Sequence, residues 1–568
     1  MTIAIPSLPL IALGGAAFVA LFPRLKRRLE LSRAKHRSLA GHPRIARRLA
    51  SFLPFYEYDD ARFFDCDGAS PQIAAQRRAG FTRLAEIYRE RFPETNRLSA
   101  EAAKSISDLQ FTERYRTPFQ FNRYVAQRLP SGAFLAASSG VTLTDLDGNI
   151  FYDLAASYGV NVFGNDFYKE TIAESEADAR ALGPVLGPYH PAIVDVVRRL
   201  KEISGQDEIS FHMSGTEAVM QAVRLARYHT RRPRLLRFCG AYHGWWGDVQ
   251  PGIGNPAPAH DTFTLSEMSP ETLHVLRTRS DIACVLVNPL QALAPNAPAP
   301  ADSSLVDSSR RAHFDRAAYT QWLKELRAIC TERGIVLIFD EVLVGFRLAR
   351  GGAQEYFGVK ADLVTYGKTL GGGFPVGVLC GRGDLMRRYR EDRPGDICFA
   401  RGTFNSHPYV ICAMRRFLQR LDEPFCRDLY RDLDRIWDER AQSLNARFEA
   451  ENMPVRVANM SSIMMVCYSE PSRYNWMLQY YLRAEGLALP WTGTGRLIFS
   501  LNYTDADFAA VAERFVAAAK TMREDGWQLA PAGLTNKAIR RGVLQEMLRH
   551  RLFGKPAAGA GSSSNAAP

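Results

Sequence analysis

The sequence predicts an α/β fold in which helices flank a mostly parallel sheet and the flanking segments build a smaller α+β domain. Between about residues 185 and 400, helical segments such as 191–203 and 317–333 alternate with apolar runs such as 282–287 and 335–339. This alternation is typical of parallel strands joined by helices that cover both faces of a sheet. A mixed portion follows, with helices near 407–450, short strands around 463–467 and 496–502, and a helix at 505–523.

Composition and charge narrow the class of protein. The chain has 568 residues, of which 46% are hydrophobic and 23% charged, which is enough for a large core and two or more subdomains. Of the net charge of +12, seven come from residues 24–62, where eleven Lys and Arg face four acids. The remainder is near neutral, so the basic pI does not indicate a nucleic-acid enzyme. The nine cysteines have no metal-ligand or disulfide spacing, so we expect no metal site and reduced thiols.

The amino-terminal segment Met1–Pro23 contains no charged side chain. Residues 3–22 are long enough for a helix to cross a bilayer once, at about 1.5 Å per residue. A cleavable signal peptide is disfavoured because no positive charge precedes the apolar run. The segment either spans the membrane or lies in its interface, since Pro6 and Pro9 leave only residues 10–22 uninterrupted. We expect residues 1–23 to anchor a cytoplasmic catalytic body, with the basic run against anionic headgroups.

Three further regions follow the predicted anchor. Residues 24–114 are basic and helical in period, and they indicate a connector without chemistry of its own. The catalytic domain is expected at 115–530, with its large domain at about 180–440. Near its start, two alternating runs flank Asp147-Gly148-Asn149, a hairpin signal. Residues 531–568 predict a carboxyl-terminal helix and a low-complexity, disordered tail.

Two short segments carry the chemistry. Residues 335–342 read IVLIFDEV, an apolar run that would deliver Asp340 at the carboxyl end of a buried parallel strand. Residues 365–373 read TYGKTLGGG and place Lys368 between an apolar approach and a glycine run. A lysine amine in a tight pocket near a carboxylate suits covalent catalysis with pyridoxal phosphate (PLP), in which an Asp pairs with the pyridinium nitrogen. Either segment alone could be structural, because strands ending in acids and solvated lysines are common.

A phosphate site is predicted where a helix follows the strand candidate at 209–213. Ser214, Gly215 and Thr216 would offer hydroxyls and free N–H groups at the start of that helix. A simple N-cap with Glu217 as its capping-box acid explains the same residues. The next strand candidate leads into a glycine-flexed loop that carries Tyr242 and His243. The Tyr242 ring could stack on a cofactor or serve only in packing.

The order of these motifs is similar to that of a known family. SGTEA, YHG, IFDEV, YGKTLGGG and GTFNSHP follow one another, and over about residues 115–525 the chain resembles a class III aminotransferase of PLP fold type I. Within that class it is most similar to the glutamate-1-semialdehyde-aminotransferase-like branch. The segments GGAQEYFGVKADLVTYGK and YHGWWGDVQPG resemble aminotransferases that work with polyketide and nonribosomal peptide synthases. The resemblance does not extend to residues 1–62.

The resemblance implies a role for each matching residue. Lys368 would bind the cofactor covalently and later move the substrate proton, and Asp340 would pair with the pyridine nitrogen. Ser214, Gly215 and Thr216 would hold the phosphate, while Tyr242, with the adjacent His243, would lie against the ring. Gln291 matches a position that contacts the ring hydroxyl. Thr403 would reach the cofactor phosphate of the partner subunit in a homodimer.

Residues at two positions in the sequence are relevant to which substrate the protein binds. The chain reads Val287-Asn288-Pro289 where the family usually has V-E-P, so a carboxylate near the substrate pocket is absent. Ser157 and Tyr158 stand where the family often places substrate-side residues, although a role in the core fits them equally.

The expected reaction is therefore amino transfer from an amino donor to a ketone or aldehyde. The favoured acceptor is a carrier-bound acyl chain, polyketide-like or lipid-like, since an apolar product would suit a membrane anchor. One alternative is an aminomutase that exchanges amino and oxo groups within one small molecule. The other is a catalytically silent, membrane-bound scaffold, against which the joint presence of Lys368, Asp340 and Thr216 speaks.

Overall fold

The computed structural model describes residues 22–132, 134–250, 252–255, 257, 259–297, 308–490, 495–529 and 531–553. The anchor expected at 1–23 falls almost wholly outside these residues and stays a prediction. Within the described ranges, no helix is both long and apolar enough to cross a membrane. The disordered tail predicted after residue 556 also lies outside them.

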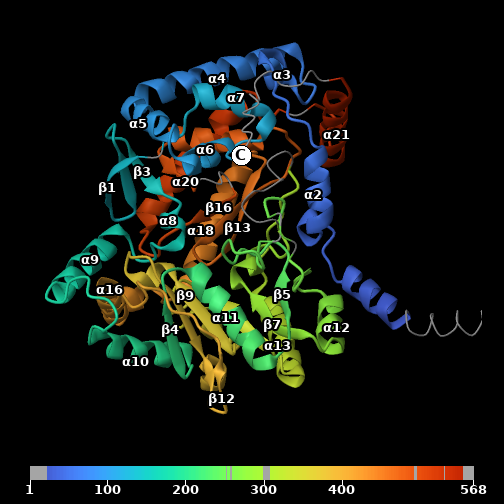
Figure 1. The fold of residues 1–568 in the computed structure, drawn as a ribbon. Helices are drawn as coiled ribbons and strands as arrows, with labels where there is room; N and C mark the ends of the chain where they lie inside the picture. Colours follow the sequence, from blue (N-terminus) through green and yellow to red (C-terminus); the bar gives the residue numbers. More distant parts are fainter. Residues whose placement is uncertain are drawn as a thin grey trace, which may run out of the picture.

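A seven-stranded sheet forms the centre of the large domain (Figure 1). Six strands run parallel and β10 alone runs antiparallel to both of its neighbours, which confirms the mostly parallel sheet. In spatial order the strands are β4 (Glu208–His212), β10 (Gly377–Gly381), β9 (Leu363–Gly367), β8 (Val336–Asp340), β7 (Ile282–Val287), β5 (Arg234–Phe238) and β6 (Thr262–Leu265).

Helices cover both faces of this sheet because its central strands are apolar on both sides. On β8, Ile338 packs into a cluster with Val219 and other side chains of α11 (Gly215–Thr230). The alternate residues Leu337 and Phe339 pack on the opposite face, in the same cluster as side chains of α13 (Arg316–Arg333). All residues of β7, β8 and β9 are buried. The further helices around this sheet are α9 (Asn165–Ala179), α10 (Ala192–Ser204), α12 (Pro270–Thr278), α14 (Gly352–Phe357), α15 (Gly383–Met386) and α16 (Pro408–Arg420).

The strand register decides what meets at the edge of the sheet. Asp340, the last residue of β8, lies beside Thr365 of β9 in the parallel pair. Two residues later β9 ends at Gly367, which is opposite Gly377 of β10. The carboxyl ends of β8 and β9 therefore open at one edge, where Asp340 and Lys368 emerge as neighbours.

Two smaller sheets and their helices form the second domain. One sheet has the order β1 (Leu135–Ser139), β2 (Thr142–Asp145), β3 (Ile150–Asp153) and β15 (Leu487–Ala488); the other has β13 (Val455–Met460), β14 (Ile463–Tyr468) and β16 (Arg496–Ile498). β2 and β3 pair antiparallel on either side of Asp147-Gly148-Asn149, as the hairpin signal predicts. The helices are α17 (Pro424–Leu429), α18 (Leu433–Ala450), α19 (Leu478–Ala484) and α20 (Asp505–Glu524).

Most of the amino-terminal helices pack directly on this second domain rather than standing apart as a linker (Figure 1). Arg77 is fully buried there, and its guanidinium pairs with Asp67 at 2.8 Å and donates to the carbonyls of Phe64 and Gly526. A buried arginine needs such a full set of acceptors. The helices are α2 (Pro43–Phe52), α3 (Asp60–Asp65), α4 (Pro71–Arg91), α5 (Pro93–Ala103), α6 (Ser107–Arg114) and α7 (Phe119–Arg128).

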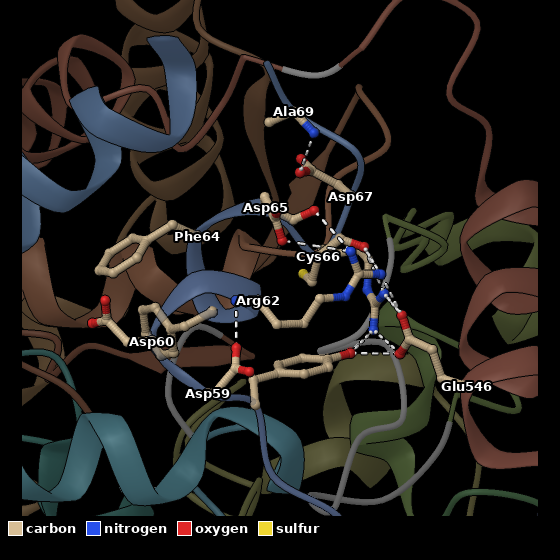
Figure 2. Close-up of polar contacts among 12 residues, drawn as sticks. Asp59, Asp60, Arg62, Phe64, Asp65, Cys66, Asp67, Ala69 and Glu546 are labelled. Carbon is tan, nitrogen blue, oxygen red and sulfur yellow. Dashed lines mark hydrogen bonds and ion pairs between the residues drawn. The ribbon is translucent and has the colours of Figure 1, made fainter. Parts of the chain in front are cut away.

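A polar cluster ties this amino-terminal part to the last helix, α21 (Asn536–Phe553). Glu546 of α21 accepts hydrogen bonds from Arg62 at 2.8 Å, Tyr58 at 2.6 Å and Arg473 at 2.9 Å (Figure 2). Burial alone would raise the pKa of Glu546, but the hydrogen bond and charge of Arg473 outweigh it and lower the pKa to about 2. Arg62 and Tyr58 are thereby tied to a residue that follows them by 484 and 488 positions in the chain.

Candidate active site

A cavity of about 740 Å³ opens at the carboxyl ends of β8 and β9, and both Asp340 and Lys368 line it. The sequence predicts these two residues as a pair, and the parallel register brings them to the same edge of the sheet. Asp340 is 4% exposed and Lys368 is half-buried. A carboxylate and an amine therefore line the same cavity. It lies at the carboxyl ends of the strands, where open α/β sheets bind their ligands.

Lys368 directly follows the last residue of β9, and the local backbone geometry positions its amine. Its φ of 42° lies in the left-handed region, which a non-glycine residue adopts only when its surroundings impose it. Its Nζ donates a hydrogen bond of 2.8 Å to the carbonyl oxygen of Tyr158. Burial lowers the pKa of Lys368; Asp340 opposes this shift and Arg347 adds to it. A lower pKa leaves more of the amine unprotonated and nucleophilic.

Asp340 is oriented by a buried histidine. Nδ1 of His243 lies 2.7 Å from Oδ2 of Asp340, and the carboxylate can only accept, so Nδ1 donates. Oδ1 accepts from the Val342 N–H at 3.2 Å. Burial lowers the pKa of His243 despite the opposing charge of Asp340, which favours the neutral ring. The two bonds fix the plane of the carboxylate.

A left-handed turn forms the wall opposite Lys368. Ala156, Ser157 and Tyr158 have φ values of 42°, 47° and 57°, each of which costs about 1–2 kcal/mol in a non-glycine residue. Asp153 compensates by accepting hydrogen bonds from the N–H groups of Ala155 and Ala156, both at 2.9 Å. The turn directs the Tyr158 carbonyl to the lysine and puts Tyr158 into the cavity wall.

The start of α11 provides an anion site in the same cavity. Ser214 caps the helix by accepting from the Glu217 N–H, as the N-cap interpretation predicts, and Gly215 and Thr216 line the cavity. The first N–H groups of a helix have no carbonyl partner within it. A Cβ on Gly215 would lie 2.7 Å from Val342, so only glycine allows this close approach. Capping and anion binding are thus compatible, because they use different groups.

Tyr242 and Asn288 form one side of the cavity together. Nδ2 of Asn288 donates to the Tyr242 carbonyl at 2.9 Å, and its Oδ1 accepts from the Leu290 N–H at 3.2 Å. Tyr242 is 51% exposed and lines the cavity, so its ring is accessible to a ligand. The Asn that replaces the usual Glu therefore fixes the loop that presents Tyr242. A carboxylate could not donate to that carbonyl.

Some of the predicted residues lie away from the cavity. Ser157 is exposed, Gln291 is buried on a short helical turn, η2 (Pro289–Leu293), and neither is among the described residues that line the cavity. Thr403 is exposed in the loop before α16 and does not line this protomer's cavity either. The position of Thr403 is compatible with a role in a partner's site, which stays a prediction.

One charged residue of the cavity, Arg496, is not predicted from the sequence. Arg496 enters the cavity from β16, in the second domain. Its Nε is buried and has no hydrogen-bond partner, and among the described residues it forms no ion pair. Burial, with Arg310 adding to it, lowers the pKa of Arg496 to about 10. A single arginine before a short strand carries no sequence signal, since its place depends on how the domains pack.

Comparison with known families decides the identity of the fold. The family model described as "Aminotransferase class-III" matches residues 124–519. The chain belongs to the class III aminotransferase family. This confirms the resemblance and the enzyme class: a class III aminotransferase is a PLP-dependent transaminase. Within the described residues, no group of His, Cys, Asp and Glu could hold a metal ion, and all nine cysteines are free and buried.

Several relatives and solved structures are similar to this class III aminotransferase. A glutamate-1-semialdehyde 2,1-aminomutase of Methanococcus maripaludis is 31% identical over 358 residues, which span 60% of this chain and 77% of the relative. A protein of the same name from Chlorobium phaeobacteroides is 33% identical over 312 residues, or 51% of this chain and 67% of the relative. A glutamate-1-semialdehyde aminomutase structure from Pseudomonas aeruginosa has a TM-score of 0.62 at 18% identity, covering 79% of this chain and 99% of that one. A β-phenylalanine aminotransferase from Variovorax paradoxus has a TM-score of 0.61 at 23% identity, covering 80% and 99%.

The residues of the cavity fit pyridoxal phosphate. The N-terminus of α11 suits the phosphate, Asp340 suits the pyridinium nitrogen, and the Lys368 amine suits the aldehyde. A Cβ on Gly244 would lie 2.3 Å from Oγ1 of Thr216, so the loop that carries Tyr242 closes directly on the phosphate end. When bound, the cofactor supplies an electron sink for the substrate carbanion. The individual residue roles stay predictions, whereas the cofactor itself follows from the family.

Proposed function

We propose that this class III aminotransferase transfers an amino group from an amino-acid donor to a ketone or aldehyde on an acyl, polyketide-like or lipid-like chain. The observation that carries this proposal is the apolar wall of the cavity, formed by Val160, Leu290, Leu343, Phe374 and Ile498. Asp340 is the only acid among the described residues that line the cavity. A wall of this kind favours an acceptor whose bulk is apolar.

Four side chains have distinct roles in the proposed amino transfer. The Lys368 amine binds the cofactor and then, when released, lies nearest to the substrate carbon and moves its proton. Asp340, held by His243, keeps the ring nitrogen protonated. Arg496 would pair with the carboxylate of the amino donor, because a buried guanidinium without an acidic partner gains most from a carboxylate ligand.

The direct test is amino transfer to acceptors of graded length. The holoenzyme is incubated with an amino-acid donor and β-ketoacyl thioesters or fatty aldehydes of increasing chain length, and the aminated product is identified by mass. We expect kcat/KM to rise with each added methylene by about threefold to fourfold while the chain stays within the apolar wall. Equal turnover at all lengths would contradict the apolar acceptor, and absence of turnover with every acyl acceptor would reject the substrate class.

A second candidate reaction is the exchange of amino and oxo groups within one small molecule. It is favoured by the relatives, which are named glutamate-1-semialdehyde 2,1-aminomutases at 31–33% identity. This reaction needs no external donor. Incubation with glutamate-1-semialdehyde alone distinguishes the two: conversion without an added amino acid supports the aminomutase, whereas dependence on a donor supports intermolecular transfer. A silent scaffold would bind no cofactor and would show no PLP absorbance.

We also propose that the protein works at a membrane, as a homodimer, with its catalytic body in the cytoplasm. The uncharged segment 1–23 and the basic run behind it support attachment to anionic lipid. An apolar acceptor, free or bound to a carrier protein, would be available there. Fractionation of cells into membrane and soluble parts, followed by detection of the full chain, tests the attachment.

A further inference from the structure

A second cavity, of about 460 Å³, lies between the amino-terminal segment and β6, and its lining residues are separate from those of the active-site cavity. Arg28, Lys35 and Arg44 line it from one side, with Arg47 beside them. Thr262, Phe263 and Thr264 of β6 line it from the other side. No acidic side chain is among the described residues that line this cavity.

Three of the positive charges in this cavity have no acidic partner among the described residues. Arg28, Lys35 and Arg44 form no ion pair with any described residue, and Glu30 of the same segment pairs with His274 instead. Burial lowers the pKa of Lys35, and the neighbouring Arg44 lowers it further. Positively charged side chains that lie close together without an acidic neighbour repel each other. A bound anion would reduce this repulsion.

A hydrogen-bonding group is also left without a partner at this place. The Oγ1 atom of Thr262, which lines the cavity, is buried and has no hydrogen-bond partner among the described residues. A buried hydroxyl without a hydrogen-bond partner is unfavourable unless a ligand or water satisfies it. Together with the cations, it makes a donor set suited to the oxygens of a phosphate group.

The walls of the cavity are fixed to the body of the protein. The Ala34 carbonyl accepts a hydrogen bond of 2.8 Å from the Ser266 N–H, just after β6, and Glu30 pairs with His274 of α12 at 3.3 Å. Arg47 donates to the Asn255 carbonyl at 3.2 Å. The cationic side chains therefore project from a docked segment and not from a free basic tail. Figure 1 shows the segment at the side of the large sheet that carries α12.

An exposed apolar stripe continues from this cavity along α2. Ile45 lines the cavity and is 52% exposed, and Leu49 and Phe52 follow at spacings of four and three residues, with 46% and 56% exposed. This spacing places all three side chains on one face of the helix. A ligand with an anionic head in the cavity could therefore lay an apolar chain along α2. A free inorganic anion would not use the stripe.

We propose that this cavity binds the phosphate headgroup of an anionic phospholipid, with an acyl chain on the Ile45–Leu49–Phe52 face of α2. The site extends the proposed membrane attachment to a defined headgroup contact, and it does not depend on the amino-transfer reaction. It would hold the catalytic body against the membrane at one fixed edge. Attachment would then not depend on the segment 1–23 alone.

The test measures lipid binding to the full chain in nonionic detergent micelles by titration calorimetry. The probes are dioctanoyl-phosphatidylglycerol, dioctanoylglycerol, which lacks the phosphate, and inorganic phosphate. We expect saturable binding of the first, none of the second, and much weaker binding of the third. Equal affinity for inorganic phosphate and the lipid would reject the acyl contact, and no saturable binding of the lipid would overturn the proposal.

Two variants that remove the same number of positive charges distinguish specific lipid binding in the cavity from nonspecific electrostatic attraction to the protein surface. The variant R28Q/K35Q/R44Q should bind the lipid at least about tenfold more weakly, because each Lys or Arg near an anionic group contributes appreciably. The control R33Q/R37Q/R48Q removes the same charge from exposed residues of the same segment that do not line the cavity, and it should bind as the wild type does. Equal losses in both variants would show unspecific attraction and reject the site. Both variants should retain amino transfer, so failure of this proposal and of the proposed reaction can be told apart.

Discussion

Nδ1 of His243 lies 2.7 Å from Oδ2 of Asp340, and both side chains are buried at the edge of the central sheet. Asp340 ends β8, whereas His243 belongs to the loop after β5, two strands away in the sheet. The bond therefore links Asp340, the predicted partner of the ring nitrogen, to the loop that presents Tyr242. It gives His243 a positioning role that the sequence alone does not define.

Replacement of His243 should weaken cofactor binding more than it weakens the fold. His243→Phe removes the hydrogen bond to a buried carboxylate, which is worth about 1.5–3 kcal/mol, so we expect the Kd for pyridoxal phosphate to rise by about tenfold or more. The measurement is absorbance titration of the apoprotein, with the unfolding midpoint of the apoprotein followed in parallel. An equal loss of stability without the cofactor would indicate a purely structural role, and His243→Asn should recover part of the affinity.

The pH dependence of cofactor capture should reflect the lowered pKa of Lys368. Only the unprotonated amine attacks the aldehyde, so capture by the apoprotein becomes faster as pH rises through the pKa. Because burial lowers that pKa, the rate should level off below the ordinary lysine value of 10.5. Stopped-flow absorbance measures the rate, with N-acetyl-lysine amide as the solvent-exposed reference. A midpoint at or above that of the reference would contradict a buried amine, and Lys368→Ala should capture no cofactor that borohydride can fix.

Arg496 should discriminate between donors with and without a carboxylate. Arg496→Gln removes the charge but keeps a polar side chain, and we expect KM for an amino-acid donor to rise by about 10–100-fold, equivalent to about 1.4–3 kcal/mol. A simple alkylamine donor should be unaffected. The comparison is steady-state kinetics with the two donors, and Arg310→Gln, the neighbouring cation outside the cavity, serves as the control. A parallel loss with both donors would mean that Arg496 acts through the structure of the cavity.

The role of Thr403 across a dimer can be tested by subunit complementation. Thr403→Glu should repel the cofactor phosphate in the partner's site, while Lys368→Ala inactivates its own site. If Thr403 serves the partner, a mixed dimer of the two variants contains one intact site. Co-refolding in equal amounts should then restore about a quarter of the wild-type activity. No recovery in a mixture that sedimentation shows to be dimeric would assign Thr403 to its own protomer.

Glu546 should make the attachment of α21 sensitive to acid. Its pKa is lowered from 4.5 to about 2, so its ionised form stabilises the folded protein above pH 4.5, and this contribution disappears as pH falls toward 2. The shift corresponds to at most about 3 kcal/mol. Glu546→Gln should remove this stabilising contribution at neutral pH, and the free energy of unfolding in urea should then depend less on pH in the acid range.

The control Glu439→Gln breaks an exposed ion pair with Arg435 and should change the free energy of unfolding by less than about 1 kcal/mol. Equal effects of the two variants would contradict the importance of the cluster.

The elements that the sequence predicts best are those with a strong apolar pattern. The run at 282–287 is β7 without change, and the helix expected at 317–333 begins only one residue earlier, at Arg316. The strand expected at 496–502 ends at Ile498, because the residues after it form a turn that leads to α20. A short apolar run that is rich in β-branched residues favours a buried strand, whereas the end of a short strand depends on which neighbour pairs with it.

The sequence by itself indicated the family and its cofactor class, and it predicted Asp340 and Lys368 as the central cofactor-binding residues, because both stand in motifs whose order resembles that of one family. Only the tertiary structure decided which further groups meet in the active-site cavity and which residues form the separate cationic cavity. The Tyr158 carbonyl, Arg496 and the cationic cavity at Arg28, Lys35 and Arg44 come from segments that are distant in the chain or carry no motif. These groups come together only because distant segments pack against each other, and no local pattern of residues predicts such long-range packing.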